Sequence, residues 1–569
     1  MATLLLLAIP LAHCLAGLLL ISGPQSDSLR WRSALLSVSI ATGLSIALLI
    51  GSLGQFPWLL DRQQTLDALP GFSLALKAQP IGLSLAASVS IAAASTVAAE
   101  AFSGASVRER VRLLGAGMLL VAAVCGTLEA GTLATMVVAW AIGTLTAVAA
   151  ALVEGEAWWA TRLALGGTLS TFTLFGVSIA VVAGSNEGPV SLGKIAALGW
   201  LGVAALAFFL ALGVWGLPWR GRLRSGGHQT EKDHEWLWLS LVSSAPIVYV
   251  VAIVLGTDGA VWSNWQFVLL LAALVLVSAG AVEQLAQPDR SCWLRGALRA
   301  EIGWALASVA IAQTLGLLAA ALGMVNLCLC GSLATRQVPS LDGDWSPSEN
   351  QISGPWRWLT LGFAMLSLGG VPPLLGFAAR WLLLTAAMSS GLVWFTLVAL
   401  VLMALPPLSV TRQLRHRGNW EAPAQAAEPR INAVNLVLSL PVAIASLAGL
   451  VLLSTSSGVV INLALQAVGR QQSSLELATP AWLILLCVVI ASLASGVVGW
   501  GDESRHRLQM ALTKWQRRLA SEKGWRREAA ALLTLVADGI GVAEDVGQRH
   551  YLAILILAGT VVIVYCLGY

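Results

Sequence analysis

Charged residues are scarce in this chain. Only 11% of its 569 residues are Asp, Glu, Lys or Arg, whereas 57% are hydrophobic and the mean hydropathy is +0.79. Soluble globular domains are roughly one quarter charged, so the composition excludes a soluble protein. The net charge of +4 is spread over short loops and gives no sign of nucleic-acid binding. The composition predicts a protein that crosses a membrane many times.

The chain also lacks the residue clusters that bind metals or catalyse reactions. Its seven cysteines include no CxxC pair, and the spacing of Cys328 and Cys330 points their side chains to different faces of a helix. We therefore predict no metal or redox centre and no cofactor. No nucleophile and base set and no phosphate-binding glycine loop is evident, so any enzymatic activity would belong to an assembly.

Tyrosine is rare, with four residues, but tryptophan is abundant, with 24. Many tryptophans lie where hydrophobic runs meet polar loops, as at Trp158 and Trp159 or at Trp356 and Trp358. This distribution is typical of the interfacial belt of membrane helices. A surface that binds quinone, lipid or pigment is the alternative interpretation.

Hydrophobic runs long enough to cross about 30 Å of hydrocarbon fill most of the chain. They lie near residues 2–21, 34–53, 81–99, 113–127, 132–152, 163–182, 195–214, 236–255, 265–282, 302–335, 358–389, 393–410, 434–453, 481–498 and 551–567. The first run has no basic segment before it and no clear cleavage site after it, so we interpret it as a retained span. The runs predict an all-α polytopic transmembrane helix bundle with about 14 to 16 membrane helices.

Loop charge predicts the orientation of these helices. Basic residues gather in alternate loops, as at Arg108, Arg110 and Arg112, and the positive-inside rule makes those loops cytoplasmic. The run 302–335 is long for one span, and counting it as two keeps the loop after 393–410 cytoplasmic. The result is sixteen crossings with both termini outside.

The longest polar interval, residues 502–544, has a helical pattern. Leu508, Leu512, Trp515 and Leu519 recur at helical spacing, with basic residues between them. The pattern predicts an amphipathic helix on the cytoplasmic side, lying along the membrane or a partner. A plain linker is the alternative.

A proline pair interrupts one strongly hydrophobic run, in the sequence GGVPPLLGFAARW. Pro372 and Pro373 lack backbone donors, and Gly370 and Gly376 allow the backbone to bend. We therefore predict a broken membrane helix with its hinge at these four residues. The alternative is a loop between two spans.

Arg380 follows this hinge inside an apolar segment. Because an arginine at membrane depth costs roughly 3 kcal/mol on insertion scales, we expect it to face the protein interior or a hydrated cavity. If the proline stretch is a loop, Arg380 lies at the interface instead. Glu301, which leads directly into a span, is the acidic residue that best fits a role in ion movement.

The remaining acidic residues and the histidines have simpler explanations. Loop or interface positions account for Glu129, Glu154, Glu156 and Glu283. His13, which lies within the first hydrophobic run, is expected to be interfacial or packed.

The proline stretch resembles the GIPPxxGFxxK pattern of the antiporter-like membrane subunits of respiratory complex I, membrane-bound hydrogenases and Mrp-type cation/proton antiporters. Residues 164–180 are similar to the sixth helix of that family, and residues 71–152 to its third to fifth helices, including a short external turn, GTLEAGT. The resemblance implies an antiporter-like core at 71–500. N-terminal helices at 1–70 would precede it, and a lateral-type amphipathic helix at 501–548 and an anchor at 549–569 would follow.

The resemblance also implies a path for protons or cations along buried lysines, a glutamate and histidines. Most of these residues are absent: the fifth-helix glutamate falls at Trp140 or Ala141, and the eighth-helix lysine at Ala245. The seventh helix ends at Trp219 and Arg220 without its usual lysine and histidine, and the eleventh, NLCLCGSLATR, has no histidine. Only the twelfth-helix cation remains, as Arg380, and arginine does not exchange protons near neutral pH.

Three functions stay open at this stage. The chain is a membrane-arm subunit that takes part in proton or cation translocation coupled to electron transfer, an ion-inactive scaffold of such an assembly, or a membrane protein that binds lipid, quinone or pigment. The first two require other membrane subunits as partners, in a bacterial plasma membrane or a thylakoid membrane.

Overall fold

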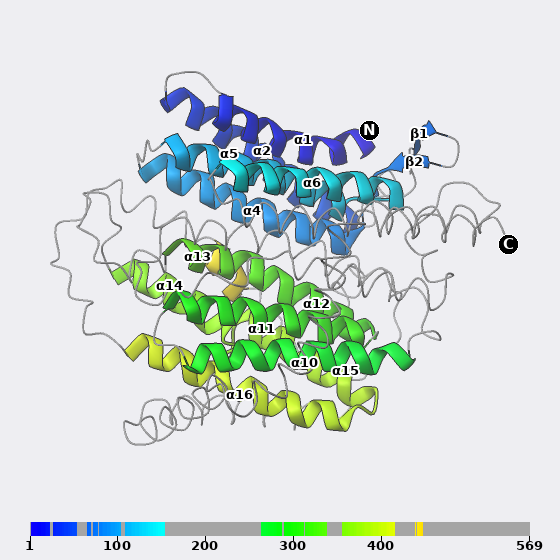
Figure 1. Ribbon diagram of the computed structural model, residues 1–569, viewed down its shortest axis with the longest axis vertical. Coiled ribbons are helices and arrows are strands. Elements are labelled where there is room, and N and C mark those ends of the chain that lie inside the picture. The colour runs from blue at the N-terminus through cyan, green and yellow to red at the C-terminus, as the bar shows by residue number, and fades with distance from the viewer. Residues whose placement is uncertain are drawn as a thin grey trace, which may run out of the picture.

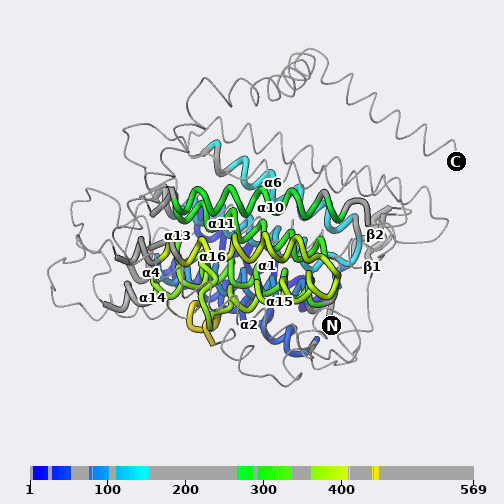
Figure 2. The backbone as a smooth tube through the Cα atoms, turned by 90° about the horizontal axis from the view of Figure 1, so that it is seen from below, coloured from blue at the N-terminus to red at the C-terminus, as the bar shows by residue number. Residues whose placement is uncertain are grey.

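The computed structural model is a bundle of helices that run in roughly the same direction (Figures 1 and 2). It describes residues 2–22, 27–53, 65–69, 72–77, 79–103, 108–153, 263–286, 290–311, 313–337, 355–415, 439 and 441–447. The predicted runs 163–182, 195–214, 236–255, 481–498 and 551–567 and the predicted amphipathic helix lie outside these residues, as do Glu154 and Glu156.

An N-terminal group of helices forms one side of the bundle in Figure 1. Its members are α1 (Ala2–Ser22), α2 (Asp27–Leu53), α4 (Pro80–Ser103), α5 (Arg108–Leu128) and α6 (Leu133–Val153). These bounds agree with the first five hydrophobic runs. α1 packs against both α2 and α5, and α5 packs against α6.

A C-terminal group forms the other side. It contains α10 (Ser263–Ala286), α11 (Arg290–Ala310), α12 (Thr314–Asn326), the π-helical turn η2 (Leu327–Gly331), α13 (Ser332–Gln337), α14 (Pro355–Leu368), α15 (Leu375–Ser389) and α16 (Val393–Arg415). The two groups meet where α4 contacts α12, η2 and α13.

The expected all-α bundle is confirmed, with one addition. Between α2 and α4, strands β1 (Thr65–Leu69) and β2 (Phe72–Ala75) pair antiparallel as a short hairpin. In Figure 1 the hairpin lies at the same end of the bundle as the N-terminus.

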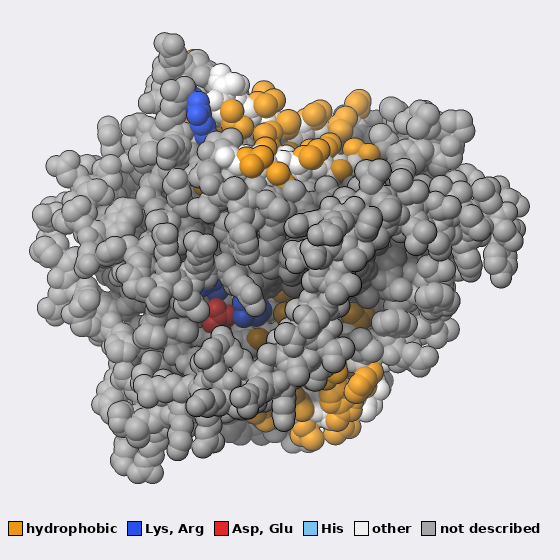
Figure 3. All heavy atoms as spheres, viewed as in Figure 1, with side chains coloured by type: hydrophobic (Ala, Val, Ile, Leu, Met, Phe, Trp, Pro, Cys, Tyr) orange, Lys and Arg blue, Asp and Glu red, His pale blue; other side chains and the backbone are white. Residues whose placement is uncertain are grey.

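The protein is an integral membrane protein. Five of the described helices are long and apolar enough to span a bilayer: Leu4–Ser22, Leu29–Ser52, Ile81–Ala101, Val111–Leu128 and Leu315–Thr335. Leucines at helical spacing are exposed along α1, and Figure 3 shows hydrophobic side chains gathered over this edge of the molecule. A lipid-facing surface has this composition, because an apolar side chain loses nothing by facing hydrocarbon.

Several hydroxyl groups inside the helices form local hydrogen bonds. The hydroxyls of Ser45, Thr127 and Ser308 each donate to the backbone carbonyl four residues earlier, at 2.7 to 2.9 Å. Such bonds allow serine and threonine to lie in a membrane helix without an unpaired donor.

The run 302–335 is shared between α11, which ends at Ala310, and a helical segment that begins with α12 at Thr314. The segment between the runs 265–282 and 302–335 is largely helical. α11 begins at Arg290 and contains Arg295 and Arg299, and Glu283, for which a loop or interface position was expected, lies within α10. Arg299 pairs with Glu283 at 2.9 Å, and this pairing offsets the cost of placing both charges on packed helices.

Candidate charged site at the broken helix

The helix interruption lies between α14 and α15. The N–H of Gly370 donates to Ser367 O and that of Val371 to Leu366 O, both at 3.0 Å, and Gly370 has a φ of +71°. This pair of bonds with a left-handed glycine is the Schellman arrangement that ends many helices. The sequence therefore stops α14 just before the two prolines.

The prolines leave two carbonyls without helical donors. In a continuous helix, Leu368 O would accept from residue 372 and Gly369 O from residue 373, and both positions are proline. Arg380 supplies the missing donors: Nη2 donates to Leu368 O at 2.6 Å and Nη1 to Gly369 O at 2.7 Å. The guanidinium also places positive charge at the negative end of the α14 dipole.

Glu301 on α11 completes the site by forming an ion pair with Arg380 Nη2. Both side chains are only 1% exposed. The ring of Trp304, one turn further along α11, lies with its centroid 5.7 Å from Arg380 Cζ and adds a cation–π contact. Carboxylate, carbonyls and indole thus replace part of the water that the buried guanidinium has lost, whereas Arg380 Nε has no hydrogen-bond partner among the described residues.

Gly370 is also required by the position of Arg380. A Cβ at this residue would overlap Nη1 and Cζ of the guanidinium. Glycine is therefore needed at this position both for the left-handed backbone turn and for the close approach of the Arg380 guanidinium.

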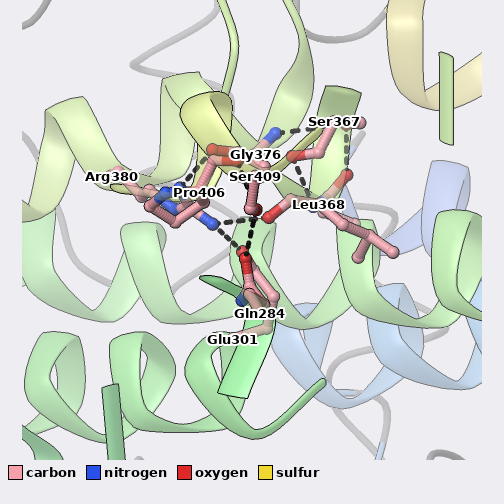
Figure 4. A network of polar contacts seen from close by, with 10 residues as sticks. Gln284, Glu301, Ser367, Leu368, Gly376, Arg380, Pro406 and Ser409 are labelled. Carbon is pink, nitrogen blue, oxygen red and sulfur yellow. Dashed lines mark hydrogen bonds and ion pairs between the residues drawn. The ribbon is translucent and has the colours of Figure 1, made fainter. Parts of the chain in front are cut away.

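A second polar contact lies beside the first. Ser367 Oγ donates to Asn326 Oδ1 at 2.6 Å, and Asn326 Nδ2 lies 3.4 Å from Ser367 O. The N–H of Gly376 approaches Ser367 Oγ at 3.5 Å, which connects α12, α14 and α15 (Figure 4). A Cβ on Gly376 would overlap Ser367 O.

An uncharged contact joins α10, α11 and α16. Ser409 Oγ lies 2.7 Å from Pro406 O and 3.3 Å from Gln284 Oε1 (Figure 4). It also accepts a hydrogen bond of 2.8 Å from Trp293 Nε1. These residues fix α16 to the helix pair that carries Glu301.

The other residues singled out in the sequence lie mostly in the interior of the bundle. His13, Glu129, Cys328 and Cys330 are buried, and both thiols lie in the core at η2. Trp140 and Ala141, at the fifth-helix glutamate position, are partly buried in α6. Within the described part of the chain, no group of three or more His, Cys, Asp or Glu is arranged to hold a metal ion.

Sequence reasoning missed the pairing of Glu301 with Arg380, although it singled out both residues separately. It also missed the Asn326–Ser367 contact. A usable signal was present, because two consecutive prolines leave two carbonyls free and a nearby arginine has a donor for each.

No model of a protein family matches the chain. Curated relatives are "NADH-quinone oxidoreductase subunit N" of Nitrosomonas europaea, 23% identical over 184 residues, and of Jannaschia sp., 27% identical over 173 residues. These matches cover 31% and 28% of this chain and 38% and 36% of the relatives. The chain thus spans well under half the length of the curated relatives that it matches.

Solved structures match over a much larger share of the chain. The Mrp complex from Dietzia sp. DQ12-45-1b has a TM-score of 0.68 at 17% identity, covering 100% of this chain and 63% of that one. An archaeal membrane-bound sulfane sulfur reductase has a TM-score of 0.67 at 15% identity, covering 97% and 99%. The chain shares its fold with these two proteins. A chain of respiratory complex I from Thermus thermophilus shares this fold as well, with a TM-score of 0.57 at 15% identity and coverage of 82% of this chain and 98% of that one.

Proposed function

We propose that the chain is a membrane-arm subunit of a multi-subunit complex that moves protons or cations across a membrane in coupling with electron transfer. The names of the curated relatives and the complexes with the antiporter-like fold support this proposal. The observation that carries it is the buried Arg380–Glu301 pair at the broken helix. Charges are expensive inside a membrane, and those that persist there commonly serve ion movement.

Within this function the two residues have different roles. Arg380 is a fixed positive charge, because arginine does not lose its proton near neutral pH. Glu301 is the partner that can accept a proton. Protonation of Glu301 would remove the ion pair and leave Arg380 with the two carbonyls and the Trp304 ring, so proton arrival would change the charge balance at the helix break.

An ion-inactive scaffold is the second candidate, and the same site gives it support. Arg380 satisfies the carbonyls that the prolines leave unpaired, which is a structural role. The uncharged Trp140 and Ala141 at the expected glutamate position also favour a subunit whose own ion path has been lost.

The placement of the chain in its assembly follows from loop charge and from the resemblance. We propose an N-terminus on the outside of a bacterial plasma membrane or thylakoid membrane, with other membrane subunits as neighbours. The proposed division is 1–70 for the N-terminal helices, 71–500 for the antiporter-like core, 501–548 for a cytoplasmic-side helix and 549–569 for an anchor.

The test compares Glu301→Gln with Glu283→Gln in tagged full-length protein from its native host. Glu283 is the matched control, since it also pairs with an arginine on a neighbouring helix, Arg299 of α11, but is partly exposed. We expect parent and both variants to co-purify with other membrane subunits in mild detergent. We expect donor-driven proton uptake by inverted vesicles to fall at least about tenfold for Glu301→Gln only, corresponding to about 1.4 kcal/mol.

The outcomes separate the two candidates. If the Glu301→Gln variant no longer co-purifies with other membrane subunits, the result favours the scaffold function. A tagged parent chain that purifies without other membrane subunits would contradict membership of a complex. If proton uptake and assembly of the Glu301→Gln variant equal those of the parent, Glu301 is needed for neither ion movement nor assembly.

A further inference from the structure

A histidine lies buried in the middle of the N-terminal group. His13 is the central residue of the span Leu4–Ser22 and is 0% exposed. Its Nε2 lies 2.9 Å from Ser90 Oγ on α4, and its Nδ1 has no hydrogen-bond partner among the described residues. The ring therefore has one nitrogen engaged with a hydroxyl and one that can take or release a proton.

Ser90 connects this histidine to two further helices. Its hydroxyl oxygen lies 3.4 Å from Ser45 Oγ on α2 and 3.9 Å from Cys125 Sγ on α5. A hydroxyl can accept one proton while it donates another, so Ser90 is a suitable intermediate between the thiol and the imidazole.

A buried glutamate follows Cys125 by one helical turn. Glu129 is 0% exposed and comes directly after α5, where its N–H still bonds to Cys125 O at 2.9 Å. The i, i+4 spacing and the backbone bond place both side chains on the same side of the C-terminal end of α5. Neither carboxylate oxygen of Glu129 has a hydrogen-bond partner among the described residues.

The backbone around Glu129 ties it to the end of the bundle that bears the hairpin. The N–H of Lys77 donates to Glu129 O at 2.8 Å, and Leu76 forms a β-bridge with Ala130. The side chain of Lys77 is exposed. Glu129 therefore lies just inside one end of the bundle, whereas His13 lies at its middle.

An ionised carboxylate in this position would be costly. A buried charge without a partner loses several kcal/mol of hydration, and groups in such sites become neutral instead. Burial raises the pKa of the Glu129 carboxyl well above its usual value. Glu301 differs, because Arg380 compensates its charge.

We propose that Glu129, Cys125, Ser90 and His13 form a buried proton file that runs from the hairpin end of the bundle to the middle of the membrane, with Glu129 and His13 as its proton-binding ends. In the net step, the Glu129 carboxylic acid passes its proton along the file to the neutral His13 imidazole and takes up another proton from water at the hairpin end, so that the carboxyl group ends neutral. Cys125 and Ser90 each accept a proton and release one, so they end unchanged. As a route for translocation the file rests on the proposed function, but proton binding by Glu129 can be tested independently of it.

The other charged side chains described in these helices are less suitable as members of a buried proton file, because they are not fully buried. Among the described residues of α1, α2, α4, α5, α6 and their connections, His13 and Glu129 are the only fully buried Asp, Glu, Lys, Arg or His side chains. Glu100 on α4 is partly exposed and provides a control.

The experiment is infrared difference spectroscopy of the full-length protein in lipid, recorded as a pH titration of the carboxylic C=O band. We expect a protonated carboxyl with a midpoint at least about one pH unit above the ordinary glutamate value of about 4.3. The band should disappear in Glu129→Gln, remain in Glu129→Asp and Glu100→Gln, and change its midpoint in His13→Asn. Equal elution profiles and helix content would show that the variants are folded.

Three results would overturn the proposal. A band that persists in Glu129→Gln would show that another carboxyl is observed. If the midpoint of the Glu129 band does not change in His13→Asn, the two residues are not coupled and do not form the ends of one file. Loss of the band on adding Na⁺ at constant pH would assign the site to a monovalent cation instead of a proton. None of these readouts requires a partner subunit or net transport.

Discussion

Arg380 joins three helices through one planar cation. It lies on α15, donates to two carbonyls at the end of α14 and pairs with Glu301 of α11. The fixed fork of the guanidinium suits three acceptors in different directions, whereas an ammonium is a compact charge on a shorter reach. At the residue scale, the site therefore depends on the shape of arginine as well as on its charge.

We expect Arg380→Lys to destabilise the protein by about 1–3 kcal/mol, because at least one carbonyl or Glu301 loses its donor. Arg380→Ala should cost more, about 3–5 kcal/mol, since it leaves Glu301 buried without a partner. Thermal unfolding in detergent measures the order of the variants. Equal stability of Arg380→Lys and the parent would show that only the charge matters.

Gly370 allows a separate test at the same scale. Gly370 and Gly391 both have a positive φ, of +71° and +73°, but only Gly370 faces the Arg380 guanidinium, whereas Gly391 has open space around it. An alanine in the left-handed region costs roughly 1–2 kcal/mol at either position. Gly370→Ala should lose clearly more in a thermal unfolding assay, because it also displaces Arg380. Similar losses for both variants would contradict this close packing.

At the scale of elements, glycines set the distance between paired helices. A Cβ at Gly296 on α11 would lie 2.7 Å from Gly280 O on α10, and one at Gly17 on α1 would lie 2.7 Å from Gly115 O on α5. Small residues permit such close contact of membrane helices, where packing replaces the hydrophobic effect. The α10–α11 contact fixes the helix that carries Glu301.

Gly296→Ala is therefore expected to destabilise the protein and to separate α10 from α11. Gly43→Ala on α2 is the matched control, since no atom lies within 4 Å of its added Cβ. Removing a helical glycine at that open position should be neutral or stabilise the protein by up to about 1 kcal/mol. Thermal unfolding compares the two. A stable Gly296→Ala would mean that the helices can move apart without cost.

At the scale of the whole molecule, the two helix groups carry different polar chemistry. The N-terminal group buries His13, Ser90, Cys125 and Glu129, and the C-terminal group buries the Arg380–Glu301 pair. The groups meet at α4 and the π-helical turn η2. π-Helical turns within α-helices are frequent at functional sites, and this one follows Asn326 directly.

The sequence by itself determined the membrane location, the first five helices, the helix break and the need for Arg380 to avoid lipid. These features depend on local hydropathy, on the missing N–H groups of Pro372 and Pro373, and on the cost of burying charge. Each of them is a property of a short segment.

Only the tertiary structure decided the partners. Glu301 lies 79 residues from Arg380, and Ser90 lies 77 residues from His13. It also showed that Glu283, for which a loop or interface position was predicted, lies in a helix and pairs with Arg299 of the next helix. The physical reason is that hydropathy and loop charge describe one segment at a time. Which buried polar groups meet depends on how closely distant helices pack, and glycines at their crossings set that distance.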